Sequence, residues 1–370
     1  MIPVCKPWLP GNEKKYVDEA LDTNWISSAG KFIDQFESGF AEFCGSKFGV
    51  SCSSGLGALH LATAALGLKK GDEVIVPTFT MAATINAIIF TGATPVFVDA
   101  DKETWCMDAG KIIEKITKNT KAIMVVHVYG HMCDMDTIME IAKDKGLKVI
   151  EDAAEAHGAE LNGKKAGSIG DIGCFSFYAN KIFTTGEGGM CVTNDSELAD
   201  EMKKLRNHAF EVPRFIHKKV GFNYRLTNIQ AAIGVAQVEN AEKLVSARRS
   251  LGERYGKALK GLPLILPVEL KGYKNVYWMY GVVLDDSVSK SKEEVMSELK
   301  EKGVDTRSFF IPMHKQPVYV DKTVENAPDC SGEYSIAEWL GEKGFYLPSS
   351  SDLTDEEIQK VAEALKQVLE

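Results

Sequence analysis

One lysine and one aspartate each follow an apolar run that could form a buried strand, and both side chains could take part in catalysis. Asp152 follows the apolar run 148–151, and open α/β sheets bind ligands beyond the C-terminal ends of such strands. Lys181 follows a second apolar run and precedes the glycine-rich turn 184–189. A partly buried lysine can form a Schiff base because burial lowers the pKa of its amine. Its position alone, however, is more typical of a lysine on a surface loop.

A serine- and glycine-rich turn, residues 53–57, opens an expected helix. Small residues let the backbone approach an anion, and the free N–H groups of a first helical turn donate to it. Alone, the turn is better explained as a helix cap, and it matches neither GxGxxG nor GxxxxGK[ST]. Together, an anion turn, an acid and a lysine are what pyridoxal phosphate needs for its phosphate, its pyridine nitrogen and its aldehyde.

These residues sit in a region where β-branched runs alternate with amphipathic stretches, which predicts an α/β fold with a parallel sheet. We expect strands at residues 73–77, 94–98, 122–127 and 148–151, and helices at 56–66, 81–90 and 134–145. The pattern changes after Thr193, with a long helical stretch from Asn228 into the 240s and a strand at 277–284. We expect a large domain over residues 1–245, including an N-terminal arm, and a smaller C-terminal domain over residues 246–370.

Composition excludes several classes of function. The 370 residues include 43 basic and 52 acidic side chains, a net charge of −9, which does not favour a nucleic-acid-coating surface. No apolar run approaches the roughly 20 residues of a membrane span, and no signal core follows the N-terminus. The eight cysteines lack CxxC spacing, so reduced thiols are expected rather than disulfides or a metal site. We expect a cytoplasmic protein without a nucleic-acid or membrane partner.

Several motifs occur in an order that resembles the DegT/DnrJ/EryC1/StrS family of sugar aminotransferases. The matching segments, besides those around Asp152 and Lys181, lie at residues 25–28, 53–55, 71–77, 127–130 and 221–232. The resemblance covers nearly the whole chain. It implies a fold-type I pyridoxal phosphate enzyme, whose large domain has a mostly parallel central sheet flanked by helices and whose smaller C-terminal domain is also α/β.

The resemblance also implies roles for individual residues. Lys181 would be the Schiff-base lysine and proton shuttle, Asp152 would pair with the pyridine nitrogen, and Asn223 would reach the phosphate from the partner subunit of a homodimer with composite active sites. The full implied cofactor set is Ser54, Gly55, Leu56, Met81, Asp152, Glu155, Ser176, Lys181 and Asn223.

Three members of this set depart from the family pattern. Leu56 stands where threonine is common and so lacks a hydroxyl for the phosphate. Met81 stands where an aromatic residue often stacks on the pyridine ring, and a thioether has no π face. Glu155 stands where glutamine is frequent beside the cofactor's phenolic oxygen, so its carboxylate would repel a phenolate unless one of them holds a proton.

The substrate implied is a nucleotide-linked 4-keto-6-deoxyhexose, with GDP preferred over UDP, on the way to a surface glycan such as an O-antigen. Glutamate would donate its amino group to C4 of the sugar, with pyridoxamine phosphate as the intermediate form of the cofactor. The expected substrate-binding residues are Trp25, Arg225, Arg307 and His314. A structural salt bridge for Arg307 and an interface role for Arg225 stay open.

Other interpretations were weighed against these. A 3-dehydratase of the same fold carries histidine where this chain has Lys181, and a catalytically silent cofactor-binding regulator would not need both Lys181 and Asp152. The sequence Asp134-Met135-Asp136 imitates a glycosyltransferase DxD motif, but helix capping explains it better. His127 is interpreted as a packed or hydrogen-bonded histidine rather than a metal ligand, and Glu187 as a turn residue.

Overall fold

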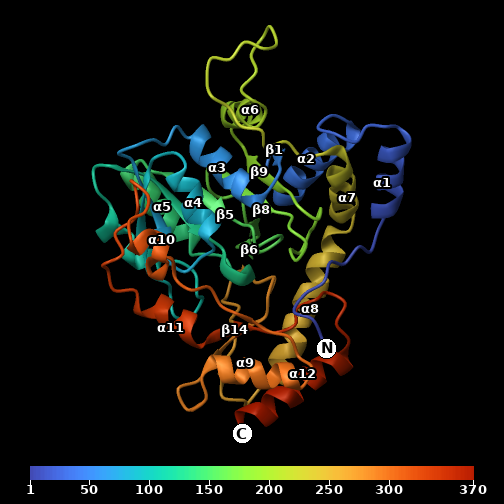
Figure 1. Cartoon of the computed structure of the whole chain (residues 1–370), viewed down its shortest axis with the longest axis vertical. Coiled ribbons are helices and arrows are strands. Elements are labelled where there is room, and N and C mark those ends of the chain that lie inside the picture. Colours follow the sequence, from blue (N-terminus) through green and yellow to red (C-terminus); the bar gives the residue numbers. More distant parts are fainter.

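The computed structural model describes all 370 residues (Figure 1). Its centre is a seven-stranded sheet in which only β9 runs antiparallel to its neighbours. In spatial order the strands are β1 (Phe48–Cys52), β9 (Gly189–Thr193), β8 (Ile172–Ser176), β5 (Lys148–Asp152), β4 (Thr120–Val126), β2 (Glu73–Pro77) and β3 (Thr94–Val98). The mostly parallel sheet confirms the predicted fold class.

The strands form where continuous apolar runs allow burial on both faces. All five residues of β8 and of β9 are buried, as are the last four residues of β5. The flanking helices are α2 (Lys31–Cys44), α3 (Gly55–Ala65), α4 (Ala82–Ile89), α5 (Met135–Lys145) and α6 (Ser196–Leu205). Strands and helices of this region agree with the predicted ranges within a few residues.

Two predicted elements differ in their limits. The long helix expected from Asn228 is divided at Asn240 into α7 (Asn228–Glu239) and α8 (Ala241–Ala258), because the Asn240 side chain donates to the Ala236 carbonyl oxygen at 2.9 Å. The strand expected at 277–284 begins at Gly281, as β12 (Gly281–Leu284). Before it, Asn275 Oδ1 accepts from the Tyr277 N–H at 2.8 Å and Tyr277 has a positive φ of 46°, which makes a turn.

The C-terminal part builds a second, smaller sheet. Its strands, in the order β10 (Leu264–Ile265), β12, β14 (Gly344–Tyr346) and β13 (Arg307–Ser308), are all antiparallel. A three-stranded ribbon joins β11 (Tyr273–Lys274) to β6 (Glu160–Leu161) and β7 (Lys164–Lys165). The remaining helices are α1 (Glu13–Asp22), α9 (Lys292–Glu301), α10 (Pro317–Val320), α11 (Ser335–Lys343) and α12 (Asp355–Leu369).

Two apolar cores correspond to the two sheets. One contains 80 buried residues, and the other contains 19, drawn from Leu251 onward and from Ile2. Both termini lie at the end of the molecule that holds the smaller core, beside α9 and α12 (Figure 1). The boundary expected at residue 245 falls inside α8, which runs toward the smaller core (Figure 1), and the division at that residue stays a prediction. No helix is both long and apolar enough to cross a bilayer.

Candidate active site

A cavity of about 460 Å³ lies beyond the C-terminal ends of β5 and β8, beside the first turn of α3. It is lined by Ser54, Gly55, Leu56, Leu59, Thr80, Met81, Ala82, Ala83, Asn86, Val126, Asp152, Ala154, Glu155, Ser176, Tyr178, Asn180, Lys181, Glu187, Trp278, Phe310 and Tyr346. The fold therefore gathers at one place every expected cofactor residue except Asn223.

Lys181 reaches this cavity from the turn that follows β8. Its Nζ lies 3.7 Å from the centroid of the Trp278 indole ring and 3.8 Å from Oε1 of Glu155. Burial lowers the pKa of the amine, and the neighbouring carboxyls of Glu155 and Asp152 oppose that shift. The amine is therefore held in surroundings that ease the loss of its proton.

Asp152 ends β5 and points into the same cavity. Its Oδ2 accepts from the Thr84 hydroxyl at 2.8 Å, and its Oδ1 accepts from the Ala154 N–H at 3.2 Å. Burial raises the pKa of this carboxyl, while the two hydrogen bonds and the charge of Lys181 work in the opposite direction. Both oxygens are thus oriented by the protein, and a cationic ring nitrogen placed against them would favour the carboxylate.

Glu155 lies three residues beyond Asp152 in the sequence, and its carboxyl lies beside the amine of Lys181. Its Oε2 accepts from the Tyr129 N–H at 2.9 Å, which leaves Oε1 facing Lys181. Burial raises the pKa of Glu155 to about 7, so the neutral acid is accessible near neutral pH.

The first turn of α3 forms one wall of the cavity. Ser54 caps the helix by accepting from the Gly57 N–H at 3.0 Å, and the first-turn N–H groups lack intrahelical acceptors. The end of β8 packs closely on this turn, because a Cβ on Gly55 would lie 2.8 Å from the Ser176 Cβ. Leu56 and Ser176 line the cavity beside this turn, where the helix N-terminus carries a partial positive charge that suits an anion.

The expected substrate residues are not gathered in the same way. Arg307 is exposed on β13, opposite Tyr346 of β14, whose side chain lines the cavity. His314 is buried between Thr78 and Glu338, with ring nitrogens 2.8 Å from the Thr78 hydroxyl and 3.0 Å from Glu338 Oε1. The structure thus places Arg307 near the cavity and His314 outside its lining.

Asn223 and Arg225 do not line the cavity of their own chain. Both are exposed, and Arg225 Nε donates to Asn223 Oδ1 at 2.9 Å. Arg225 lines a small recess together with Ser28 of the 25–30 loop.

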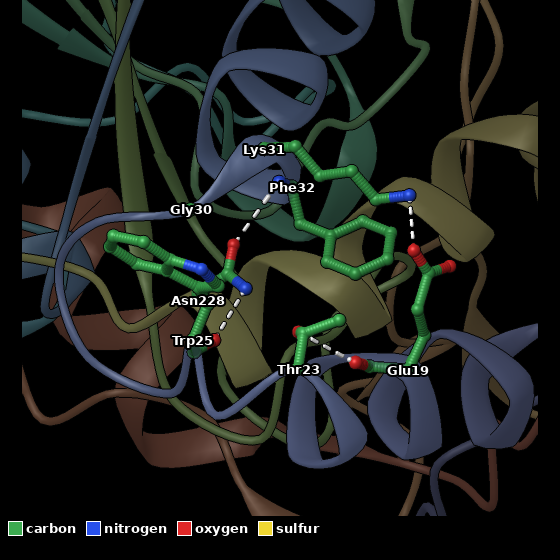
Figure 2. Close-up of a pocket in the computed structure, with 7 residues that line it drawn as sticks. All are labelled: Glu19, Thr23, Trp25, Gly30, Lys31, Phe32 and Asn228. Carbon is green, nitrogen blue, oxygen red and sulfur yellow. Dashed lines mark hydrogen bonds and ion pairs between the residues drawn. The ribbon is translucent and has the colours of Figure 1, made fainter.

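Trp25 borders another pocket, of about 410 Å³, shown in Figure 2. The side chain of Asn228 ties the Trp25 loop to α2: its Nδ2 donates to the Trp25 carbonyl at 2.6 Å and its Oδ1 accepts from the Phe32 N–H at 3.1 Å (Figure 2). The indole of Trp25 is 59% exposed. Trp25 therefore stands outside its own chain's cavity, on a fixed loop.

Three other motifs are explained by local hydrogen bonds. Asp134 caps α5 by accepting from the Thr137 N–H at 3.1 Å, as the capping interpretation predicts. His127 Nε2 lies 2.9 Å from Oε2 of the buried Glu151. The Glu187 carbonyl accepts from Thr185 and from Gln230, which fixes the turn, although the residue also lines the cavity.

Comparison with known proteins decides the family. A model of the DegT/DnrJ/EryC1/StrS aminotransferase family matches residues 9–366. The chain belongs to this family. It is a pyridoxal-phosphate-dependent aminotransferase, and its fold is shared with Spr1654 from Streptococcus pneumoniae in its PLP form, at a TM-score of 0.91 and 26% identity, with 99% of this chain and 98% of that chain covered.

Two curated relatives of this aminotransferase match over their full length. The GDP-perosamine synthase of Caulobacter vibrioides is 47% identical over 372 residues, covering 100% of this chain and 98% of the relative. The GDP-perosamine synthase of Escherichia coli O157:H7 is 45% identical over 367 residues, covering 99% and 98%.

The cavity of the aminotransferase fits the cofactor that its family uses. It offers one buried lysine, one oriented carboxyl and one helix N-terminus, and the buried Oδ1 of Asn180 at its wall has no hydrogen-bond partner in the protein. Several lining residues were not predicted as site residues, among them Thr80, Trp278, Phe310 and Tyr346. No local sequence pattern marks Trp278 and Phe310 as cavity residues.

Proposed function

We propose that this aminotransferase transfers the amino group of glutamate to C4 of GDP-4-keto-6-deoxymannose and so forms GDP-perosamine. The proposal is supported by the full-length similarity to two GDP-perosamine synthases, at 47% and 45% identity. The observation that carries the proposal is that Lys181 and Asp152 line the same cavity. The chain that contains this cavity matches both enzymes over nearly their whole length.

The cofactor residues divide into three groups by chemistry. The helix end at Ser54, Gly55 and Leu56, with the Ser176 hydroxyl, would hold the phosphate. Asp152 would keep a proton on the ring nitrogen, and Met81 would pack against the ring. Bound pyridoxal phosphate supplies an aldehyde for amine exchange and a ring that withdraws electrons from the reacting carbon.

Lys181 is the group placed to move protons. In its neutral form the Nζ can accept the proton from Cα of glutamate, and in the second half of the reaction it can deliver a proton at the sugar's C4. Burial, which lowers the pKa of this amine, makes the neutral form easier to reach. The apolar walls formed by Trp278 and Phe310 limit the access of water to these steps.

The assembly belongs to the same proposal. Asn223, Arg225 and Trp25 are exposed and do not line their own cavity, and a homodimer would bring them to the cavity of the partner subunit. Asn223 would then reach the phosphate, and Trp25 and Arg225 the substrates. Arg307, close to the cavity through Tyr346, would meet the diphosphate, because a guanidinium pairs well with phosphate oxygens.

The experiment is amination of a panel of nucleotide sugars. The purified protein, loaded with pyridoxal phosphate, is incubated with glutamate and with GDP- or UDP-linked 4-keto-6-deoxy sugars, and products are identified by mass spectrometry. The proposal expects the GDP-linked 4-amino sugar. Amination of UDP sugars alone would overturn the GDP assignment, and a 3-deoxy product without added nitrogen would indicate a dehydratase.

A further inference from the structure

The Glu155 carboxyl is the feature of the cavity that the mechanism above leaves unused. It is 6% exposed and lies 3.8 Å from the amine of Lys181. One oxygen, Oε2, is occupied by the Tyr129 N–H, and the other faces the amine. Of these two contacts, the Lys181 amine is the one that can exchange a proton with the carboxyl.

The other titratable groups around this pair are Asp152, Tyr129, Tyr346, His157 and Cys5. Burial raises the pKa of Tyr129 and brings that of Tyr346 to about 12, so both phenols stay neutral. Burial lowers the pKa of His157 to about 3, so its ring is neutral as well. Cys5 is half-buried, and its thiol lies within 3.4 Å of the Arg248 guanidinium.

Asp152 is the other carboxyl whose charge acts on the amine, and its hydrogen bonding differs from that of Glu155. Both of its oxygens are already hydrogen-bonded, to Thr84 and to Ala154, and its proposed duty is to the ring nitrogen of the cofactor. Glu155 has an oxygen directed at the amine instead. Geometry therefore selects Glu155 as the group that can exchange a proton with Lys181.

We propose that Glu155 is the proton partner of Lys181: its carboxylate takes one proton from the ammonium, leaving a neutral acid and a neutral amine, and returns it in the reverse step. No oxidant or further reactant is needed, because one N–H bond is exchanged for one O–H bond. This inference rests on the proposed role of Lys181. It gives a function to the glutamate that stands where relatives of the family often have glutamine.

The test uses the full-length protein freed of cofactor. Pyridoxal phosphate is added over a range of pH, and its uptake is followed by the absorbance of the bound cofactor. Only the neutral amine reacts with the aldehyde, so the midpoint of the rate–pH profile reports the pKa of Lys181. The midpoint is the readout, since removing a negative charge also speeds the approach of an anionic cofactor at every pH.

The variants form a graded series. Glu155→Gln removes the charge that favours the ammonium, so the midpoint should fall by about one pH unit. Well below the midpoint this shift corresponds to roughly tenfold faster uptake, after correction for the change in rate that is the same at every pH. Glu155→Asp withdraws the carboxyl and should give a smaller fall. Glu160→Gln makes the same chemical change outside the cavity, where Glu160 pairs with Lys274, and should leave the midpoint unchanged.

Coincident midpoints for the wild type, Glu155→Gln and Glu155→Asp would overturn the inference while leaving the aminotransferase function intact. Should Glu155→Gln fail to fold by circular dichroism, Glu155→Asp decides the question alone. A wild-type protein that takes up no cofactor, or a Lys181→Ala variant that takes it up equally fast with the same absorbance, would contradict the proposed function instead.

Discussion

The amine of Lys181 lies over the face of the Trp278 indole, with the Nζ 3.7 Å from the ring centroid. The ring is oriented by its own Nε1, which donates to the Asn180 carbonyl at 2.8 Å, and the main chain of Trp278 accepts from Arg248 at 3.0 Å. A cation–π contact of this kind contributes about 0.5–2 kcal/mol to holding an ammonium. Trp278 therefore partly offsets the burial that favours loss of the proton.

The position of Trp278 predicts an optical signal. Loading with pyridoxal phosphate should quench tryptophan fluorescence, because Trp278, alone among the five tryptophans, lines the cavity of its own chain. In Trp278→Phe, which keeps an aromatic face, most of the quench should disappear, whereas Trp105→Phe should retain it. A quench of equal size in Trp278→Phe and the wild type would contradict this placement.

The two hydrogen bonds that orient Asp152 predict graded losses of cofactor affinity. Asp152→Asn keeps the shape but removes the charge, and should weaken binding about tenfold to a hundredfold, as expected for a charge-assisted contact of about 1.5–3 kcal/mol. Thr84→Val should cost less, about fivefold, for one neutral hydrogen bond, and Thr84→Ser should bind like the wild type. Equilibrium titration measures all three, and unchanged affinity in Asp152→Asn would remove Asp152 from the site.

The exposed position of Asn223 predicts complementation between inactive chains. Asn223→Asp would set a carboxylate against the phosphate, and Lys181→Ala would remove the reactive amine. In a mixed dimer of the two variants, one site would combine an intact Lys181 with the partner's intact Asn223, and about half of wild-type activity should return. Mixed dimers, isolated with two affinity tags, that are no more active than the Asn223→Asp homodimer would exclude composite sites.

His157 predicts a loss of stability in acid. Its ring is buried among Phe40, Phe175 and Phe177, and burial lowers the pKa to about 3 from an ordinary value of 6.5. The unfolded chain then binds a proton that the folded chain does not, so the contribution is complete above pH 6.5 and is lost as pH falls toward 3.

Between pH 6.5 and 4.5 this group alone should cost about 2.3 kcal/mol. His157→Phe, which suits the aromatic surroundings, should not show that loss. Denaturant unfolding of both proteins at several pH values measures the difference. A difference between the two proteins that does not change with pH would refute the assignment.

The central part of the fold could be predicted because its signals are local. The apolar run before Asp152 and the small residues around Gly55 reflect burial and close packing in their own segments. The cavity walls formed by Trp278 and Tyr346 could not be predicted, because the sequence around them does not indicate that the C-terminal segment packs against the ends of β5 and β8. The division at Asn240 escaped prediction for another reason: a single side-chain hydrogen bond interrupts a pattern that is helical throughout.

The substrate residues show the same limit. An arginine and a histidine after a strand look alike as ligands for phosphate, yet Arg307 is exposed near the cavity whereas His314 is enclosed by Thr78 and Glu338. The difference arises from contacts between segments more than two hundred residues apart, Thr78 and His314 being separated by 236 positions. Periodicity and composition carry no information on such a contact.

The central claim is that Lys181 carries the chemistry of this aminotransferase, and one measurement tests it directly. The protein is loaded with pyridoxal phosphate, reduced with borohydride to make the lysine–cofactor link permanent, digested and analysed by mass spectrometry. We expect a single modified peptide, with the label on Lys181, and neither label nor turnover in Lys181→Ala. A label on a different lysine, or undiminished turnover in Lys181→Ala, would contradict it.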